Sequence, residues 1–201
     1  RQLGRFVTFT LWCNCLVALY WWASSTVSVL EALDVDGMAT TAVRNAAGVL
    51  WAVVFPLAWL VAMVVSFVLI PAGRRTDPER VAVMLRWRPL FLHNGYILAC
   101  VAELLVSRPH VDATRWPVML LFGTSYLLFA YAMYLRIGVF AYFFLDPTFA
   151  WAPAAYLALL ALVMLCFHAC VHVSAWLATT TSPALACALV TAAALCTCTW
   201  R

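Results

Sequence analysis

Apolar residues in this chain are grouped in long blocks separated by short polar segments. Five blocks are long enough to cross a bilayer, at about 6–33, 46–70, 89–106, 116–135 and 153–178. A run of about 20 apolar residues crosses as a helix, because backbone groups in hydrocarbon must pair within their own segment. A sixth block, 183–200, is thinner, and its crossing is left open. The pattern predicts an all-α transmembrane bundle of five to six spans, forming one domain over residues 1–201.

Polar and helix-breaking residues mark the ends of these blocks. Asp34 to Gly37 close the first block, Pro71 ends the second, and Pro89 suits the first turn of the third. The aromatic stretch 140–151 is too short and too interrupted to cross again. We expect it to lie at the membrane interface, where aromatic rings are favoured.

Composition agrees with a membrane protein, since 67% of the residues are hydrophobic, 10% are charged and the mean hydropathy is +0.97. No soluble domain of this size tolerates such a surface. The first block is too long and too rich in tryptophan for a cleaved signal peptide. Because the chain starts at Arg1 and stops at Arg201 beside an apolar run, we expect it to be trimmed, with room for a span upstream.

Arginine indicates the orientation, because the chain contains no lysine. If the spans alternate, three arginines, Arg44, Arg108 and Arg115, fall on one side. Eight fall on the other side, namely Arg1, Arg5, Arg74, Arg75, Arg80, Arg86, Arg88 and Arg136. The arginine-rich side is predicted to be cytosolic. We expect an endoplasmic-reticulum or plasma-membrane protein whose active site opens toward the cytosol.

Thr8 and His93 are the candidate catalytic pair. Each lies near the start of its block, and both starts are on the arginine-rich side, about 5 Å inside the helix end. A histidine within reach can take the proton of a threonine hydroxyl as its oxygen adds to an ester carbonyl, and can then protonate the leaving alkoxide. This chemistry requires no metal or organic cofactor. A structural histidine at the interface is the alternative interpretation.

Four short motifs resemble one known family. Arg5-Phe6-Val7-Thr8-Phe9 resembles an FLTF opening, and Phe55-Pro56 looks like the Phe-Pro of the next helix. Leu92-His93, with Glu103 ten residues later, is similar to a Leu/His segment and its downstream glutamate. Tyr142 to Asp146 looks like a Tyr-Pro-Phe-Leu-Glu stretch. In this order, over about residues 5–150, they resemble the androgen-induced and androgen-dependent TFPI-regulating protein family of membrane hydrolases.

The resemblance implies a threonine hydrolase that cleaves fatty acid esters of hydroxy fatty acids, with Thr8 as nucleophile and His93 as base. Two features differ from the family. Pro89 to His93 keeps only the last histidine of a His-Gly-Met-His segment, and Tyr134-Leu135 stands in place of a His-His pair. These differences bear on substrate preference more than on the reaction. The expected partners are a lipid ester from the bilayer and membrane lipids, without nucleic acid.

Other polar residues inside the blocks are candidates for substrate contacts, namely Asn94, Glu103, Asn14 and Tyr126. Asn94 is a candidate oxyanion donor, although a rotation of about 100° separates it from His93. Glu103 stands about 15 Å along the helix from His93. We favour a structural hydrogen bond for Glu103, with Asn14, Ser24 or Tyr126 as its partner, because a lone carboxylate in a membrane is costly.

A rival hypothesis concerns His168 and His172, which are four residues apart and share a helix face. They could bind zinc or copper, or one could hold a haem with His93 opposite. The simpler interpretation is two histidines bonded to neighbouring helices. A non-catalytic membrane scaffold is the third class. The eight cysteines lie almost entirely in apolar blocks, where cysteine behaves as a small apolar residue, so no disulfide framework is expected.

Overall fold

The computed structural model describes residues 8–138, 140, 142–148 and 150–199. Every regular element in these residues is a helix. The long helices are α1 (Phe9–Ala32), α2 (Met38–Met63), α5 (Trp87–Ser107), α6 (Trp116–Ile137), α7 (Ala152–Thr179) and α8 (Pro183–Thr197). The shorter elements are η2 (Val64–Leu69), α3 (Ile70–Thr76), α4 (Pro78–Met84), η3 (Ala113–Arg115) and η4 (Phe143–Leu145).

The predicted all-α transmembrane bundle is confirmed. Five helical segments are long and apolar enough to span a membrane, at Phe9–Ala32, Met38–Thr76, Trp87–Ser107, Ala113–Ile137 and Ala152–Thr179. The chain is therefore a multi-pass membrane protein. The sixth block forms α8, whose 15 residues are fewer than the 20 or so that a perpendicular crossing needs.

The second span is longer than the sequence predicted. It starts at Met38, well before residue 46, and at its first turn the hydroxyls of Thr40 and Thr41 donate to the carbonyls of Val35 and Gly37. It also continues past Ile70, so the predicted break at Pro71 is wrong. Pro71 stands in the first turn of α3, where a missing N–H is tolerated.

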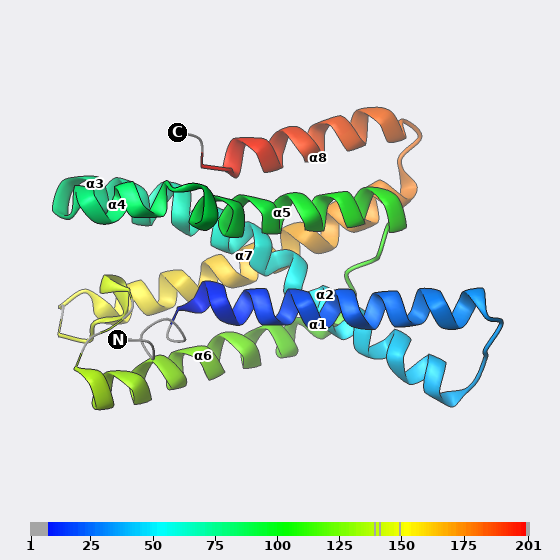
Figure 1. Ribbon diagram of the computed structural model, residues 1–201, viewed down its shortest axis with the longest axis horizontal. Helices are drawn as coiled ribbons and strands as arrows, with labels where there is room; N and C mark the ends of the chain where they lie inside the picture. The colour runs from blue at the N-terminus through cyan, green and yellow to red at the C-terminus, as the bar shows by residue number, and fades with distance from the viewer. Residues whose placement is uncertain (1–7, 139, 141, 149, 200–201) are drawn as a thin grey trace.

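The helices surround α2, which crosses the middle of the bundle (Figure 1). Of the most apolar part of this span, 61% of residues are buried, against 17–33% in the other four. Trp51 and Phe55 stack at its centre with ring centroids 4.9 Å apart. The α8 helix is outermost and lies along α5 (Figure 1). The first and third spans, α1 and α5, begin on the same side of the bundle (Figure 1). Their N-terminal residues therefore lie near the same face of the membrane.

The aromatic stretch between α6 and α7 contains one short 3-10 turn, η4, in its described residues. Asp146 orders the connection by accepting hydrogen bonds from the Thr148 hydroxyl at 2.7 Å and its backbone N–H at 2.9 Å. These bonds lower the pKa of Asp146, because they favour its charged form. The Tyr156 hydroxyl on α7 donates to the Leu145 carbonyl at 2.7 Å. The stretch is thus fastened to α7, with Leu145 buried.

Candidate functional site

Thr8 is the residue that precedes the first turn of α1. Its backbone is extended, its side chain is half-buried, and its carbonyl accepts the backbone N–H of Leu11 at 3.1 Å. Ring contacts hold this helix end against α6. The Phe9 ring meets Tyr126 edge-on, with centroids 4.8 Å apart, and Trp12 meets Phe129 at the same separation. Arg5, Phe6 and Val7, which precede Thr8 in the motif, lie outside the described residues.

A cavity of about 80 Å³ opens directly beside this helix start. Its walls come from the first turn of α1, from α2 and η2, and from α6, η4 and α7. Leucine, valine, phenylalanine and glycine make up most of the wall. The exceptions are four residues with hydroxyl groups, Thr10, Thr124, Tyr126 and Tyr142. The cavity therefore offers a ligand a hydrocarbon surface with a small number of hydrogen-bonding groups.

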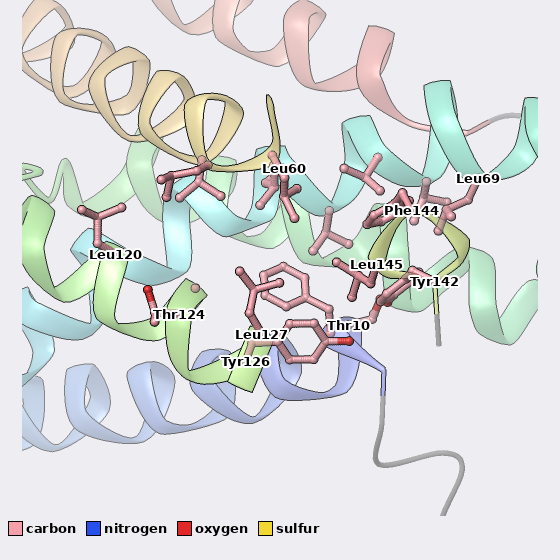
Figure 2. A pocket seen from close by; sticks show the side chains of 18 residues that line it. Thr10, Leu60, Leu69, Leu120, Thr124, Tyr126, Leu127, Tyr142, Phe144 and Leu145 are labelled. Carbon is pink, nitrogen blue, oxygen red and sulfur yellow. The ribbon is translucent and has the colours of Figure 1, made fainter. Parts of the chain in front are cut away.

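Three of the four hydroxyl residues gather where α1 begins, and Thr124 lies with Leu120 at the opposite end (Figure 2). The Tyr142 hydroxyl interacts with the Thr10 side chain and with the backbone amides of Phe9 and Thr10. The Tyr126 hydroxyl interacts with the amide of Phe9. Burial raises the pKa of Tyr142, so its hydroxyl keeps its proton at neutral pH. Hydrogen-bond donors and the positive end of a helix dipole thus share one end of the cavity.

A second cavity of about 290 Å³ adjoins the first on the side of the α6 C-terminus. The two cavities share three wall residues, Thr124, Leu127 and Leu145. The rest of the second wall is also mainly apolar and includes Phe140, Tyr131 and Tyr156. Leu127 and Leu145 therefore separate two neighbouring spaces that hydrocarbon could fill.

No family model, curated protein or solved structure matches this chain. The comparisons therefore supply no residue roles, and the arrangement of the side chains has to carry the argument about function. Thr10 and Tyr142 were not among the candidates from sequence. The signal for Tyr142 was its place in the Tyr142–Asp146 motif, whereas nothing in the sequence distinguished Thr10 from other threonines in the spans.

His93 lies at the depth of the α1 start. The Tyr20 hydroxyl on α1 donates to the Glu103 carboxylate on α5 at 2.9 Å, and the two helices run in the same direction (Figure 1). Thr10 lies ten residues before Tyr20 on α1, and His93 lies ten residues before Glu103 on α5, so the two residues lie at a similar depth. The His93 ring is half-buried, and its Nδ1 is enclosed with no hydrogen-bond partner among the described residues. His93 lines neither cavity. It lies at the depth of Thr8 and Thr10, but on α5 rather than at the start of α1.

Asn94 holds the end of the described chain against α5. Its side-chain nitrogen donates to the Thr199 carbonyl at 2.7 Å, and its oxygen accepts the Thr199 backbone N–H at 3.1 Å. Ser66, in the π-helical turn η2, donates to the Thr197 carbonyl at 2.8 Å and lies 2.6 Å from the Thr199 hydroxyl. Both amide atoms of Asn94 thus serve a structural contact in this arrangement.

Glu103 forms the structural hydrogen bond that the sequence favoured, but with a different partner. Its carboxylate accepts from Tyr20, which was not among the expected partners Asn14, Ser24 and Tyr126. Asn14 is half-buried on α1 and lines neither cavity, whereas Tyr126 lines the first. Of the four candidate substrate-contacting residues, Tyr126 is therefore the one that the structure places at a cavity.

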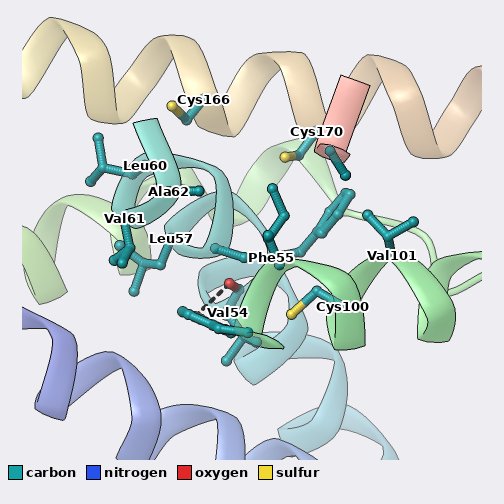
Figure 3. Close-up of a cluster of buried hydrophobic side chains, with 14 of the residues drawn as sticks. Val54, Phe55, Leu57, Leu60, Val61, Ala62, Cys100, Val101, Cys166 and Cys170 are labelled. Carbon is teal, nitrogen blue, oxygen red and sulfur yellow. Dashed lines mark hydrogen bonds between the residues drawn. The ribbon is translucent and has the colours of Figure 1, made fainter. Parts of the chain in front are cut away.

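His168 and His172 lie on the exposed side of α7. The neighbouring Cys166 and Cys170 are buried and face the core around Phe55 (Figure 3). Within the described residues, no three or more histidine, cysteine, aspartate or glutamate side chains are grouped so that they could hold a metal ion. The described residues therefore offer no third ligand of these types for a zinc or copper ion at this pair.

Proposed function

We propose that this protein is an integral-membrane hydrolase of lipid esters, with fatty acid esters of hydroxy fatty acids as substrates. The observation that carries the proposal is the group of hydroxyls and helix amides in the first turn of α1, at one end of an apolar cavity. Thr8 precedes this turn in the chain and does not itself line the cavity. A lipid ester needs a hydrocarbon surface for its chain and polar groups for its carbonyl. The resemblance of the Thr8 and His93 motifs to the androgen-induced hydrolases supports the reaction type.

In the proposed reaction, the Thr8 hydroxyl oxygen adds to the ester carbonyl while His93 takes the hydroxyl proton. The carbonyl oxygen then carries a negative charge, which the protonated hydroxyls of Tyr126 and Tyr142 would stabilise as hydrogen-bond donors. The intermediate expels the hydroxy acid as an alkoxide, which His93 protonates. His93 then deprotonates a water, whose oxygen adds to the acyl-threonine carbonyl. The Thr8 oxygen leaves and takes the proton back from His93, which releases the fatty acid and restores both side chains.

The proposal places the active site at the cytosolic face of the endoplasmic reticulum or plasma membrane. Water is present at this depth, whereas substrate chains reach the cavity from the bilayer. Of the eight arginines that predict this orientation, Arg1 and Arg5 lie outside the described residues. Support comes from Arg74 and Arg75 in the last turn of α3 and from Arg136 in the last turn of α6.

The first test is release of free fatty acid from a fatty acid ester of a hydroxy fatty acid by the purified protein in detergent. Thr8→Ala should lose hydrolysis and should also lose labelling by a fluorophosphonate probe, because the nucleophile is gone. Thr41→Ala is the matched control, since Thr41 also stands at a helix start but on the opposite side of the span. Unchanged hydrolysis in Thr8→Ala would exclude Thr8, and an inactive, folded wild-type protein would refute the proposed activity.

His93 is tested separately, because its ring lines neither cavity. His93→Ala should lose hydrolysis while the protein stays inserted and folded, because Nδ1 makes no hydrogen bond whose loss would weaken the fold. A loss of about 10²–10⁴-fold is typical when a general base is removed. His172→Ala is the control, since that imidazole is exposed on α7. Full turnover in His93→Ala would remove His93 from the mechanism.

A further inference from the structure

Gly123 leaves open space at the end of the first cavity that lies away from α1. It lies on the α6 face between Leu120 and Leu127, which also line the cavity. A Cβ atom built at Gly123 meets no heavy atom within 4 Å. Small residues in membrane helices often let another helix approach closely, but among the described residues no neighbouring element comes within that distance of the Gly123 Cβ position. Gly123 therefore leaves a space that neighbouring side chains do not use.

The distribution of polar groups indicates the kind of molecule that fits. Beyond Thr10, Tyr126 and Tyr142 at one end and Thr124 at the other, the wall is hydrocarbon. At about 80 Å³, the cavity has room for a short row of water-sized groups, because one such group needs about 10–15 Å³ of cavity volume. Water gains little between leucine and valine side chains, because it finds too few partners. A polar head at the α1 start, followed by methylenes toward Gly123, satisfies both ends.

We infer that this cavity binds the first part of a lipid's hydrocarbon chain, with the polar head at the α1 start and Gly123 keeping the far end open. The occupant is a single fatty acyl chain from the bilayer, either as a free acid or as part of an ester. Moving a chain from the bilayer into a leucine-lined cavity removes no apolar surface from water. Selection among chains therefore depends on shape at Gly123 and on hydrogen bonds at the head. The inference rests on the proposed function for the bond that reacts, but the binding of the chain does not require hydrolysis.

The test uses the full chain in lipid nanodiscs and a palmitic acid analogue that carries a photoreactive diazirine and a terminal alkyne. Saturable cross-linking, competed by unlabelled palmitic acid, should map to peptides of α6 and the 142–148 segment. Gly123→Leu should reduce the competed signal by roughly 5- to 150-fold, the effect expected of an overfilled site. Gly123→Ala should keep most of it, because one methyl group fits. Gly48→Leu is the matched control, since a Cβ there also meets nothing within 4 Å and Gly48 lines neither cavity.

Each outcome decides the inference. Loss of competed labelling in Gly123→Leu, with labelling kept in Gly48→Leu, supports the site. Labelling that no competitor reduces, that maps to lipid-facing residues outside the cavity, or that is equal in both leucine variants refutes it. Circular dichroism and gel filtration show whether both leucine variants fold. If Gly123→Leu misfolds, Gly123→Phe and Leu120→Trp are tested in its place, because each also fills the far end of the cavity. If labelling behaves as expected but the folded wild-type protein does not hydrolyse the ester, the proposed function fails and the binding site stands.

Discussion

At the scale of single residues, the bond between Tyr20 and Glu103 explains how this membrane protein contains a buried carboxyl group. Glu103 is 8% exposed, and its Oε1 atom accepts a hydrogen bond from the Tyr20 hydroxyl at 2.9 Å. An unpaired carboxyl group in this environment would cost several kcal/mol. The same bond links α1 to α5, ten residues along each helix from Thr10 and His93. Glu103 therefore supports the candidate site from a distance, as a structural residue.

Removing this acceptor should weaken the fold more than it changes the chemistry. Glu103→Leu removes the acceptor for the buried Tyr20 hydroxyl, and we expect it to lower the free energy of unfolding by about 1–2 kcal/mol. Glu103→Gln keeps an acceptor oxygen and should cost less than that. The measurement is unfolding of the purified protein in mixed micelles. Glu31→Gln is the control, because the Glu31–Arg44 ion pair is about half exposed and such pairs contribute little. Equal stability of Glu103→Leu and wild type would contradict the structural role.

The partner of Glu103 also illustrates what the sequence could and could not predict. The sequence predicts that the Glu103 carboxyl group accepts or donates a hydrogen bond, because an unpaired carboxyl group in a membrane is costly. This follows from the chemistry of that side chain alone. The identity of the partner depends on how two helices are rotated and shifted against each other, and several hydroxyl and amide residues on α1 fit the chemistry. Thr10 and Tyr142 escaped prediction for the same reason, since their meeting depends on a short turn that packs between α1 and α7.

At the scale of helices, the π-helical turn η2 contacts two different parts of the molecule, the first cavity and the residues at and after the C-terminal end of α8. A π-helical turn is wider than an α-helical one, and such turns often occur at functional sites. Val64, Val65 and Leu69 of η2 line the first cavity, whereas Ser66 faces the chain end and bonds to Thr197 and Thr199. Block lengths in the sequence predicted the span but not this local widening, because no residue type specifies a π-helix. The predicted stop at Pro71 was wrong for a related reason, since proline is compatible with a first helical turn.

The contact between Asn94 and Thr199 should fasten α8 to α5. Asn94→Ala leaves the backbone N–H and carbonyl of Thr199 without these partners, so α8 should detach more often. Hydrogen exchange of peptides covering 183–197 should become faster in Asn94→Ala than in wild type, and Ser66→Ala should have a smaller effect because it leaves the Thr199 backbone paired. Asn45→Ala, at an exposed position of α2, serves as the control. Unaltered exchange in Asn94→Ala would show that the Asn94–Thr199 contact does not hold α8, and would leave apolar packing and the Ser66 hydrogen bonds as what holds it.

At the scale of the whole molecule, the candidate chemistry lies beside one end of the hydrophobic core, because Leu60 and Val65 belong to that core and also line the first cavity. The core around Trp51 and Phe55 lies in the central span, whereas Thr8, the hydroxyl residues and both cavities lie beside the start of α1 and along α6 and α7. Long apolar blocks predicted the number of spans well, because bilayer thickness fixes their length. The position of the cavities could not be read from the sequence, since every block is apolar on several faces and each face is compatible with either lipid or protein contact.

The orientation of the bundle decides which compartment supplies water to the proposed site, and it can be measured directly. Arg74, Arg75 and Arg136 follow spans that should end in the cytosol, whereas Arg44, paired with Glu31 at 2.8 Å, lies on the opposite side. A flexible insert with a glycosylation acceptor placed after Asp36 should be glycosylated in cells, and the same insert after Arg86 should stay unmodified. The reverse pattern would put the α1 start in the lumen. Thr8 would then hydrolyse only esters reached from that leaflet, so the outcome also determines on which side the released hydroxy acid leaves the membrane.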